Sequence, residues 1–157
     1  NPEVLHDLNV LSTPVHYKPE FGKVVGQHQG AHYFTIGQRK GLQVGGKPEP
    51  LFVLETDTNQ NVIYTGQGDH HPGLYRHCLK LDAGSLNLIS GETALPVGLK
   101  MKVMARVRYR QPLQEAVLIN TESACYIWFY SSQRGITPGQ FAAWYDGSVL
   151  LGSGVIS

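Results

Sequence analysis

Short apolar runs separated by turn signals dominate the second half of the sequence and constrain the fold most. They lie at residues 76–81, 100–110, 115–119, 124–130, 141–145, 149–152 and 154–156. Runs of this length are typical of antiparallel strands, and Asp146-Gly147 is a strong signal for a two-residue hairpin turn. The 18 glycines and 9 prolines also favour turn-rich β structure over long helices. The pattern therefore predicts a mainly β fold, either a sandwich or a small closed barrel.

The first half of the sequence carries fewer strand signals. Residues 51–55 and 62–65 are apolar runs joined by a polar turn, which predicts one hairpin. Residues 1–11 predict a short helix, because their apolar side chains recur every three or four positions. The sequence GQGD at residues 66–69 has the composition of a linker. We therefore expect a small central α+β or β domain over residues 1–66 and a β domain over residues 67–157.

A glycine-rich stretch at residues 26–46 contains six glycines, two histidines and the basic pair Arg39–Lys40. Glycine lets the backbone approach another surface closely, and exposed N–H groups beside basic side chains can bind phosphate. We predict an anion contact through Arg39 and Lys40. The alternative is a surface turn with solvated charges. His28 and His32 have helical metal-ligand spacing, but no further ligand stands nearby, so we expect a histidine that hydrogen-bonds the loop backbone.

Residues 100–110 form the clearest electrostatic feature. At a period of two residues, one face is apolar and the other concentrates five of the thirteen Lys and Arg residues. These cations are Lys100, Lys102, Arg106, Arg108 and Arg110. Strict alternation points Tyr109 toward the apolar side. A polyanion partner is one explanation of the charged row, and pairing with Glu115 or Glu122 across the sheet is the other.

Several function classes find no support in the sequence. Its net charge is only +1, so affinity for nucleic acid must come from a local patch. No apolar run has the length of a membrane span, and no signal-peptide pattern opens the chain, so we expect a cytoplasmic location and no membrane partner. No phosphate-binding loop, nucleophile elbow or metalloprotease motif occurs, so we expect no catalytic residue, cofactor site or metal site in this chain.

Cys78 and Cys125 each lie inside an apolar run without a C-x-x-C partner. Such thiols are expected to be reduced and buried rather than nucleophilic. The chain opens with Asn1 rather than Met, and we expect it to be part of a longer protein.

Three groups of residues together resemble the tRNA-specific 2-thiouridylase family, labelled in older usage as methyltransferases. The first group is Gly26, His28, Gly30, Tyr33 and the run TIGQRKGL at residues 35–42. The second is Arg108-Tyr109-Arg110, and the third is TPGQ at residues 137–140, YDG at 145–147 and LGSGVI at 151–156. Their order and spacing resemble the family from about Lys23 to the end, whereas residues 1–22 match poorly.

The resemblance implies that the chain corresponds to the C-terminal part of such enzymes, a central connecting domain followed by a closed antiparallel β-barrel. In the full family an N-terminal domain uses ATP to activate the wobble uridine of tRNA, and a persulfide cysteine then delivers sulfur from a sulfur-carrier protein. The phosphate loop and reactive cysteines of that domain are not in this sequence. The chain is therefore expected to bind tRNA and to be inactive by itself.

The resemblance places Arg108, Tyr109 and Gln140 at family positions that contact tRNA. The charged row adds Arg106 and Arg110, and the glycine-rich stretch adds Arg39 and Lys40. A different hypothesis is a non-enzymatic adaptor whose barrel binds RNA or protein, and a third is a purely structural β module. The sequence that precedes Asn1 separates the first two hypotheses: a phosphate loop and paired cysteines there favour the enzyme, and a start codon at Asn1 or an unrelated domain favours the adaptor.

Overall fold

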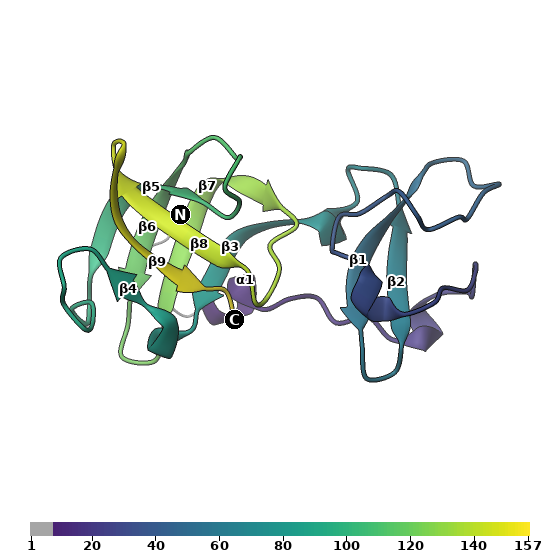
Figure 1. The fold of residues 1–157 in the computed structure, drawn as a ribbon, viewed down its shortest axis with the longest axis horizontal. Helices are drawn as coiled ribbons and strands as arrows, with labels where there is room; N and C mark the ends of the chain where they lie inside the picture. Colours follow the sequence, from purple (N-terminus) through teal and green to yellow (C-terminus); the bar gives the residue numbers. More distant parts are fainter. Residues whose placement is uncertain (1–7) are drawn as a thin grey trace. The chain divides into compact units, whose positions relative to one another are not determined.

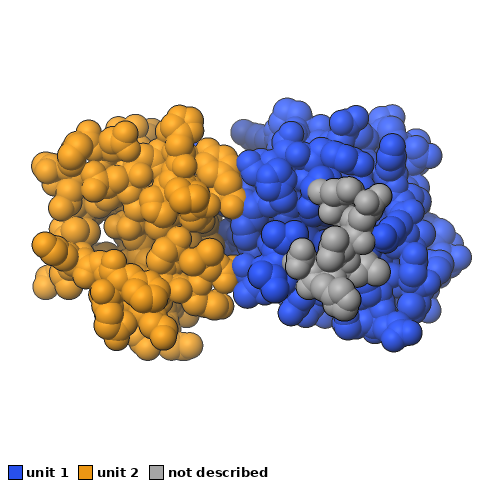
Figure 2. All heavy atoms as spheres, turned by 180° about the vertical axis from the view of Figure 1, so that it is seen from behind, with its two compact units in different colours: residues 1–13, 76–157 blue, residues 14–75 orange. Residues whose placement is uncertain are grey.

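The computed structural model describes residues 8–157, which divide into two compact units (Figure 2). One unit comprises residues 14–75, and the other comprises residues 76–157 together with the chain up to Thr13. The sequence predicted a division after residue 66, whereas the boundary between the two units lies between Tyr75 and Arg76. The predicted N-terminal helix is present as α1 (Leu8–Ser12), and its earlier residues lie outside the described part.

The unit of residues 14–75 is built around the predicted hairpin of β1 (Leu51–Asp57) and β2 (Val62–Gln67) (Figure 1). The Asp57 carboxylate starts the turn by accepting the N–H groups of Asn59 and Gln60, both at 2.9 Å. Three 3-10 turns complete the unit: η1 (Pro19–Phe21), η2 (Ala31–Tyr33) and η3 (Pro72–Leu74). Its small core is formed by Phe52, Leu54 and Leu74, with Tyr17 and Tyr75 packed against them.

The second unit is a seven-stranded sheet in the order β3-β7-β6-β5-β8-β9-β4 (Figure 1). Its strands are β3 (Tyr75–Leu81), β4 (Asn87–Leu88), β5 (Lys100–Arg106), β6 (Gln114–Asn120), β7 (Cys125–Arg134), β8 (Phe141–Asp146) and β9 (Val149–Val155), with the 3-10 turn η4 (Ala83–Ser85) between β3 and β4. The mainly β prediction is confirmed. The hairpin predicted at Asp146-Gly147 joins β8 to β9, and Gly147 takes a φ of 57° there.

The end of β3 also meets the end of the chain. Leu81 and Ile156 form an isolated antiparallel bridge. The N–H of Asp82 donates to the Val155 carbonyl at 2.9 Å, and the N–H of Ser157 donates to the Lys80 carbonyl at 3.0 Å. These contacts join the first strand of the sheet to the segment that follows β9.

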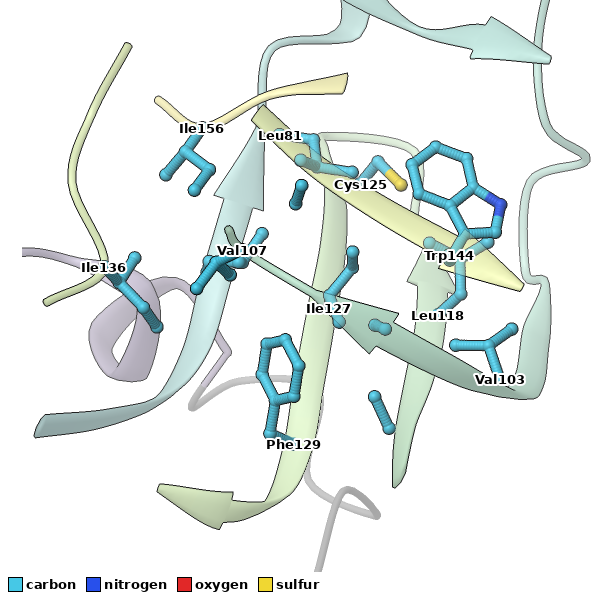
Figure 3. Packing of buried hydrophobic residues seen from close by; sticks show 14 of the residues in the cluster. Leu81, Val103, Val107, Leu118, Cys125, Ile127, Phe129, Ile136, Trp144 and Ile156 are labelled. Carbon is cyan, nitrogen blue, oxygen red and sulfur yellow. The ribbon is translucent and has the colours of Figure 1, made fainter. Parts of the chain in front are cut away.

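Apolar side chains from the inner faces of these strands form the main core (Figure 3). Its largest member is Trp144, which is 1% exposed and packs in one cluster with Phe129, Leu118 and Ile127. A second cluster on the other side of β6 and β7 contains Val117, Ile119 and Tyr126, and Leu8 of α1 belongs to it. The short helix therefore covers part of the outer sheet face.

Glycine in β9 permits a close approach between strands. A Cβ atom on Gly152 would lie 2.5 Å from Cζ2 of Trp144 and 2.9 Å from the Asn87 carbonyl oxygen. Because Trp144 is buried in the main core, its ring has no room to retreat. Gly152 therefore allows β9 to pass between Trp144 and β4.

Candidate nucleic-acid interface

The basic run forms β5 and follows the predicted alternation along most of its length. Val103, Ala105 and Val107 are buried, whereas Lys100 and Lys102 are exposed and Arg106 is half-buried. The apolar side chains join the main core, so the pleat itself directs the cations to the opposite face.

The strand ends earlier than the run of basic residues does. β5 stops at Arg106, and the N–H of Gln111 donates to the Arg108 carbonyl at 3.1 Å to close a turn. The Gln111 side chain also accepts the N–H of Val107 at 3.1 Å. Alternation predicted that Tyr109 points inward, and this is wrong: its side chain is 84% exposed, because the backbone has left the sheet before it.

Arg106 organises this turn. Its guanidinium donates from Nη1 to the Tyr109 carbonyl at 2.8 Å and from Nη2 to the Tyr145 hydroxyl at 2.9 Å. Its Cζ atom also lies 5.3 Å from the ring centroid of each tyrosine. Sequence analysis missed Tyr145, although its position beside inward-facing Trp144 on β8 indicates an outward side chain.

The turn after β5 is tied to the connection between β7 and β8. Arg108 donates from Nη2 to the Gly135 carbonyl at 3.2 Å, and the Thr137 hydroxyl donates to the same oxygen at 2.9 Å. A turn over the TPGQ sequence follows, with Gly139 at a φ of 86° and the Gln140 N–H donating to the Thr137 carbonyl at 3.2 Å. The side-chain Oε1 of Gln140 is buried without a hydrogen-bond partner among the described residues.

We call residues 106–111 and 135–140 the strand-end surface. Arg108, Tyr109 and Arg110 are exposed on it, and Gln140 is half-buried. The structure thus brings together five of the seven predicted site residues, the five that lie in the β-sheet unit.

The cations of residues 100–110 have no carboxylate partner. Throughout residues 8–157, no Asp or Glu oxygen lies within 4.0 Å of their charged nitrogens, and the two ion pairs found there both involve histidine. Glu115 lies opposite Met104 in the sheet, on the same face as Lys102 and Arg106, but bonds to neither. Cross-sheet pairing therefore does not explain the charged row.

Arg39 and Lys40 lie in the other unit, both exposed. Gly37 and Gly41, at φ values of 85° and 89°, flank their turn. The Gly37 N–H donates to the Val53 carbonyl at 2.7 Å, and the Gln38 N–H donates to the Thr35 carbonyl at 3.0 Å. The glycine-rich pattern suggested that N–H groups of this turn could bind an anion, but those of Gly37 and Gln38 are already bonded within the protein. The exposed Arg39 and Lys40 side chains remain available for such a contact.

The Gln38 side chain also folds back on the turn. Its Nε2 donates to the Lys40 carbonyl at 2.8 Å, and its Oε1 accepts the Thr35 N–H at 3.1 Å. Arg39 lines an open groove of about 550 Å³ with the segment from Leu42 to Leu51.

The two cysteines and His28 have structural roles. Burial raises the pKa of both the Cys78 and the Cys125 thiol to about 12, and both cysteines are free. His28 Nδ1 accepts the N–H of Gly30 at 3.1 Å, which confirms the expected bond to the loop backbone. In the described part of the chain, no three His, Cys, Asp or Glu side chains are grouped to hold a metal, and no helix there could span a membrane.

Two family models match the chain. Residues 13–67 match the tRNA methyl transferase PRC-barrel domain, and residues 79–156 match the aminomethyltransferase beta-barrel domain. Together these matches leave only the N-terminal segment, the connection between the units and the last residue outside them.

Curated proteins named tRNA-specific 2-thiouridylase MnmA are similar to nearly the whole chain. The protein from Christiangramia forsetii is 53% identical over 153 residues, covering 98% of this chain and 39% of that protein. The one from Flavobacterium johnsoniae is 50% identical over 151 residues, covering 96% and 38%. The one from Halalkalibacterium halodurans is 42% identical over 137 residues, covering 86% and 35%. The chain thus spans less than two fifths of each of these relatives' length, and it belongs to the tRNA-specific 2-thiouridylase family, whose two barrel-type domains it contains.

Proposed function

We propose that this chain is the tRNA-binding part of a tRNA wobble-uridine 2-thiolation enzyme. The observation that supports it best is the strand-end surface, where exposed Arg108 and Arg110 flank exposed Tyr109 and no carboxylate of residues 8–157 forms an ion pair with them. Uncompensated cations on one surface repel each other, and a polyanion relieves that repulsion. We propose tRNA as this polyanion, because the relatives are named as tRNA-specific enzymes.

Each residue type on this surface suits one part of an RNA. Guanidinium groups bind phosphate oxygens through paired N–H donors, which fits Arg108 and Arg110. An exposed tyrosine ring offers a face on which a base can stack, which fits Tyr109. A carboxamide both donates and accepts hydrogen bonds, and the half-buried Gln140 side chain places such a group on this surface. Arg39 and Lys40 of the other unit are proposed as further phosphate contacts.

The β-sheet unit would act as a rigid support for these residues. We propose that it is a closed barrel, in which the bridge between Leu81 and Ile156 completes the ring of strands. Closure removes the free strand edges and fixes the strand ends relative to one another. Arg108 and Gln140 reach the surface from two such ends, so their spacing would be set by the sheet.

The chemistry of thiolation would belong to the domain that the resemblance places outside this chain. The Cys78 and Cys125 thiols, buried and with pKa values of about 12, are unsuited to carry sulfur. The residues described here do not fit ATP: their α-helix, Leu8–Ser12, has five residues, and they form no phosphate loop before a helix. ATP, a sulfur-carrier protein and the N-terminal domain are proposed as partners of the whole enzyme, in the cytoplasm.

Fluorescence anisotropy of a labelled tRNA titrated with the chain tests this proposal. We expect saturable binding in about 50–100 mM salt, with Arg108→Ala and Gln140→Ala each weakening it by about 1–3 kcal/mol, or roughly 5- to 150-fold. Lys18→Ala is the matched control, because it removes an exposed cation outside both proposed contacts. A wild-type chain that fails to bind tRNA, or variants that bind as tightly as the control, would refute the proposed function.

A further inference from the structure

The Arg106 guanidinium is already engaged by the protein, although its side chain belongs to the charged row. Two of its nitrogens donate to oxygens of Tyr109 and Tyr145, and the rings of both tyrosines lie 5.3 Å from its Cζ atom. A phosphate ligand needs free N–H groups in a fork, and this arrangement uses part of the fork internally. Arg106 is half-buried with both Nη atoms donating to the protein, whereas exposed Arg108 donates only from Nη2, to the Gly135 carbonyl, and Arg110 is exposed.

The bonds of Arg106 fix the one aromatic ring that the turn exposes. Its bond to the Tyr109 carbonyl spans three residues and holds the turn against the end of β5. The Tyr145 hydroxyl, on the neighbouring strand β8, holds the guanidinium from the other element. The guanidinium lies over the Tyr109 ring, yet 84% of that side chain remains exposed. A planar ring held in place but open to solvent suits stacking of an unpaired base.

We propose that Arg106 and Tyr145 are positioning residues that hold Tyr109 for stacking on an unpaired nucleobase of the RNA, and that Arg106 binds no phosphate. The inference rests on the proposed function and names the part of the RNA that this turn contacts. Pre-ordering the ring removes the entropy cost of immobilising it on binding. The positive charge behind the ring also strengthens its attraction to an electron-rich base.

The test uses variants that separate geometry from charge. Arg106→Lys keeps the positive charge but cannot donate to both tyrosines through a planar fork. Tyr145→Phe removes only the hydroxyl, and Tyr109→Ala removes the stacking ring. Tyr130→Phe is the matched control, because the exposed Tyr130 hydroxyl makes no hydrogen bond in the described structure. Tryptophan fluorescence during urea unfolding checks that each variant stays folded.

The affinity of labelled tRNA is measured across about 50–250 mM salt, where each phosphate contact contributes about 0.7–0.9 to the slope of log K against log salt. We expect Tyr109→Ala to lose about 5- to 100-fold in affinity. Arg106→Lys and Tyr145→Phe should each weaken binding without changing the slope. A double variant of Tyr109→Ala with Arg106→Lys or with Tyr145→Phe should bind tRNA as tightly as Tyr109→Ala by itself, because all three substitutions act through the Tyr109 ring.

Other results would overturn the inference. If Arg106→Lys binds like wild type while Arg106→Gln lowers the slope by about 0.7–0.9, Arg106 is a phosphate ligand. If Tyr109→Ala or Tyr145→Phe binds like the Tyr130→Phe control, no stacking ring is being positioned. In either case the proposed tRNA-binding function would still be supported by the effects of Arg108→Ala and Gln140→Ala. Absence of tRNA binding by the wild-type chain would instead refute both proposals together.

Discussion

Replacing Gly152 with alanine tests how the strands of the β-sheet unit pack. The new Cβ atom would lie 2.5 Å from Trp144 Cζ2 and 2.9 Å from the Asn87 carbonyl oxygen, and both distances are shorter than a carbon atom tolerates. Overpacking of this kind costs about 1–3 kcal/mol. Removing a glycine from a strand returns about 0.5–1 kcal/mol. We therefore expect a net loss of about 1–2 kcal/mol in the free energy of unfolding.

Such a loss corresponds to a decrease in Tm of roughly 4–15 °C for a unit of this size. Tryptophan fluorescence is a selective probe, because both tryptophans, Trp128 and Trp144, lie in the β-sheet unit. Gly84→Ala is the matched control in the same unit, since its Cβ would meet only the Asp82 carboxylate oxygen at 3.6 Å. If Gly152→Ala unfolds at the same temperature as Gly84→Ala, the inference that β9 packs too closely on Trp144 to accept a Cβ atom at residue 152 is wrong.

Two further predictions concern buried groups. Burial raises the pKa of the Cys78 and Cys125 thiols to about 12. Both thiols therefore stay protonated in the folded protein up to about pH 12, whereas in the unfolded chain they ionise from about pH 9. The free energy of unfolding should therefore decrease by up to about 1.4 kcal/mol per pH unit per thiol between pH 9 and 12. Urea unfolding at several pH values should show a smaller decrease for Cys78→Ala than for the wild type. An equal decrease would contradict the raised pKa of Cys78. Arg76 donates to the Ser12 carbonyl at 2.5 Å and the Ile136 carbonyl at 2.9 Å. Arg76→Met should cost about 2–4 kcal/mol in the free energy of unfolding, because both oxygens lose their donor, and a loss below about 1 kcal/mol would show that other donors replace it.

Local patterns predicted the strands because each strand buries one face. The alternation of apolar and basic residues predicted β5, and it holds one residue beyond the strand, to buried Val107. Turn chemistry predicted the hairpin at Gly147. The same alternation failed at Tyr109, because periodicity contains no information on where a strand leaves the sheet. That position depends on the Arg106 and Gln111 side chains, which bond to the backbone of the turn.

The candidate site required contacts that the sequence pattern cannot reveal. The charged row and the family resemblance pointed to Arg108 and Gln140. The Gly135 carbonyl accepts from both Arg108 and Thr137, and this link between Arg108 and the segment that carries Gln140 depends on two strand ends meeting. Tyr145 lies 39 residues from Arg106, and their bond follows from the pairing of β5 with β8. Side chains held in this way across a sheet become visible only once the register is known.

The most direct test of the account is a map of where tRNA contacts the chain. Backbone amide NMR signals of the 17.3 kDa protein can be followed as tRNA is added. We predict that the changed signals cluster at residues 106–111 and 135–140, whereas the β6–β7 turn at residues 121–124, at the opposite end of these strands, stays unchanged. Changes centred on residues 121–124 with none at the strand-end surface would contradict the account.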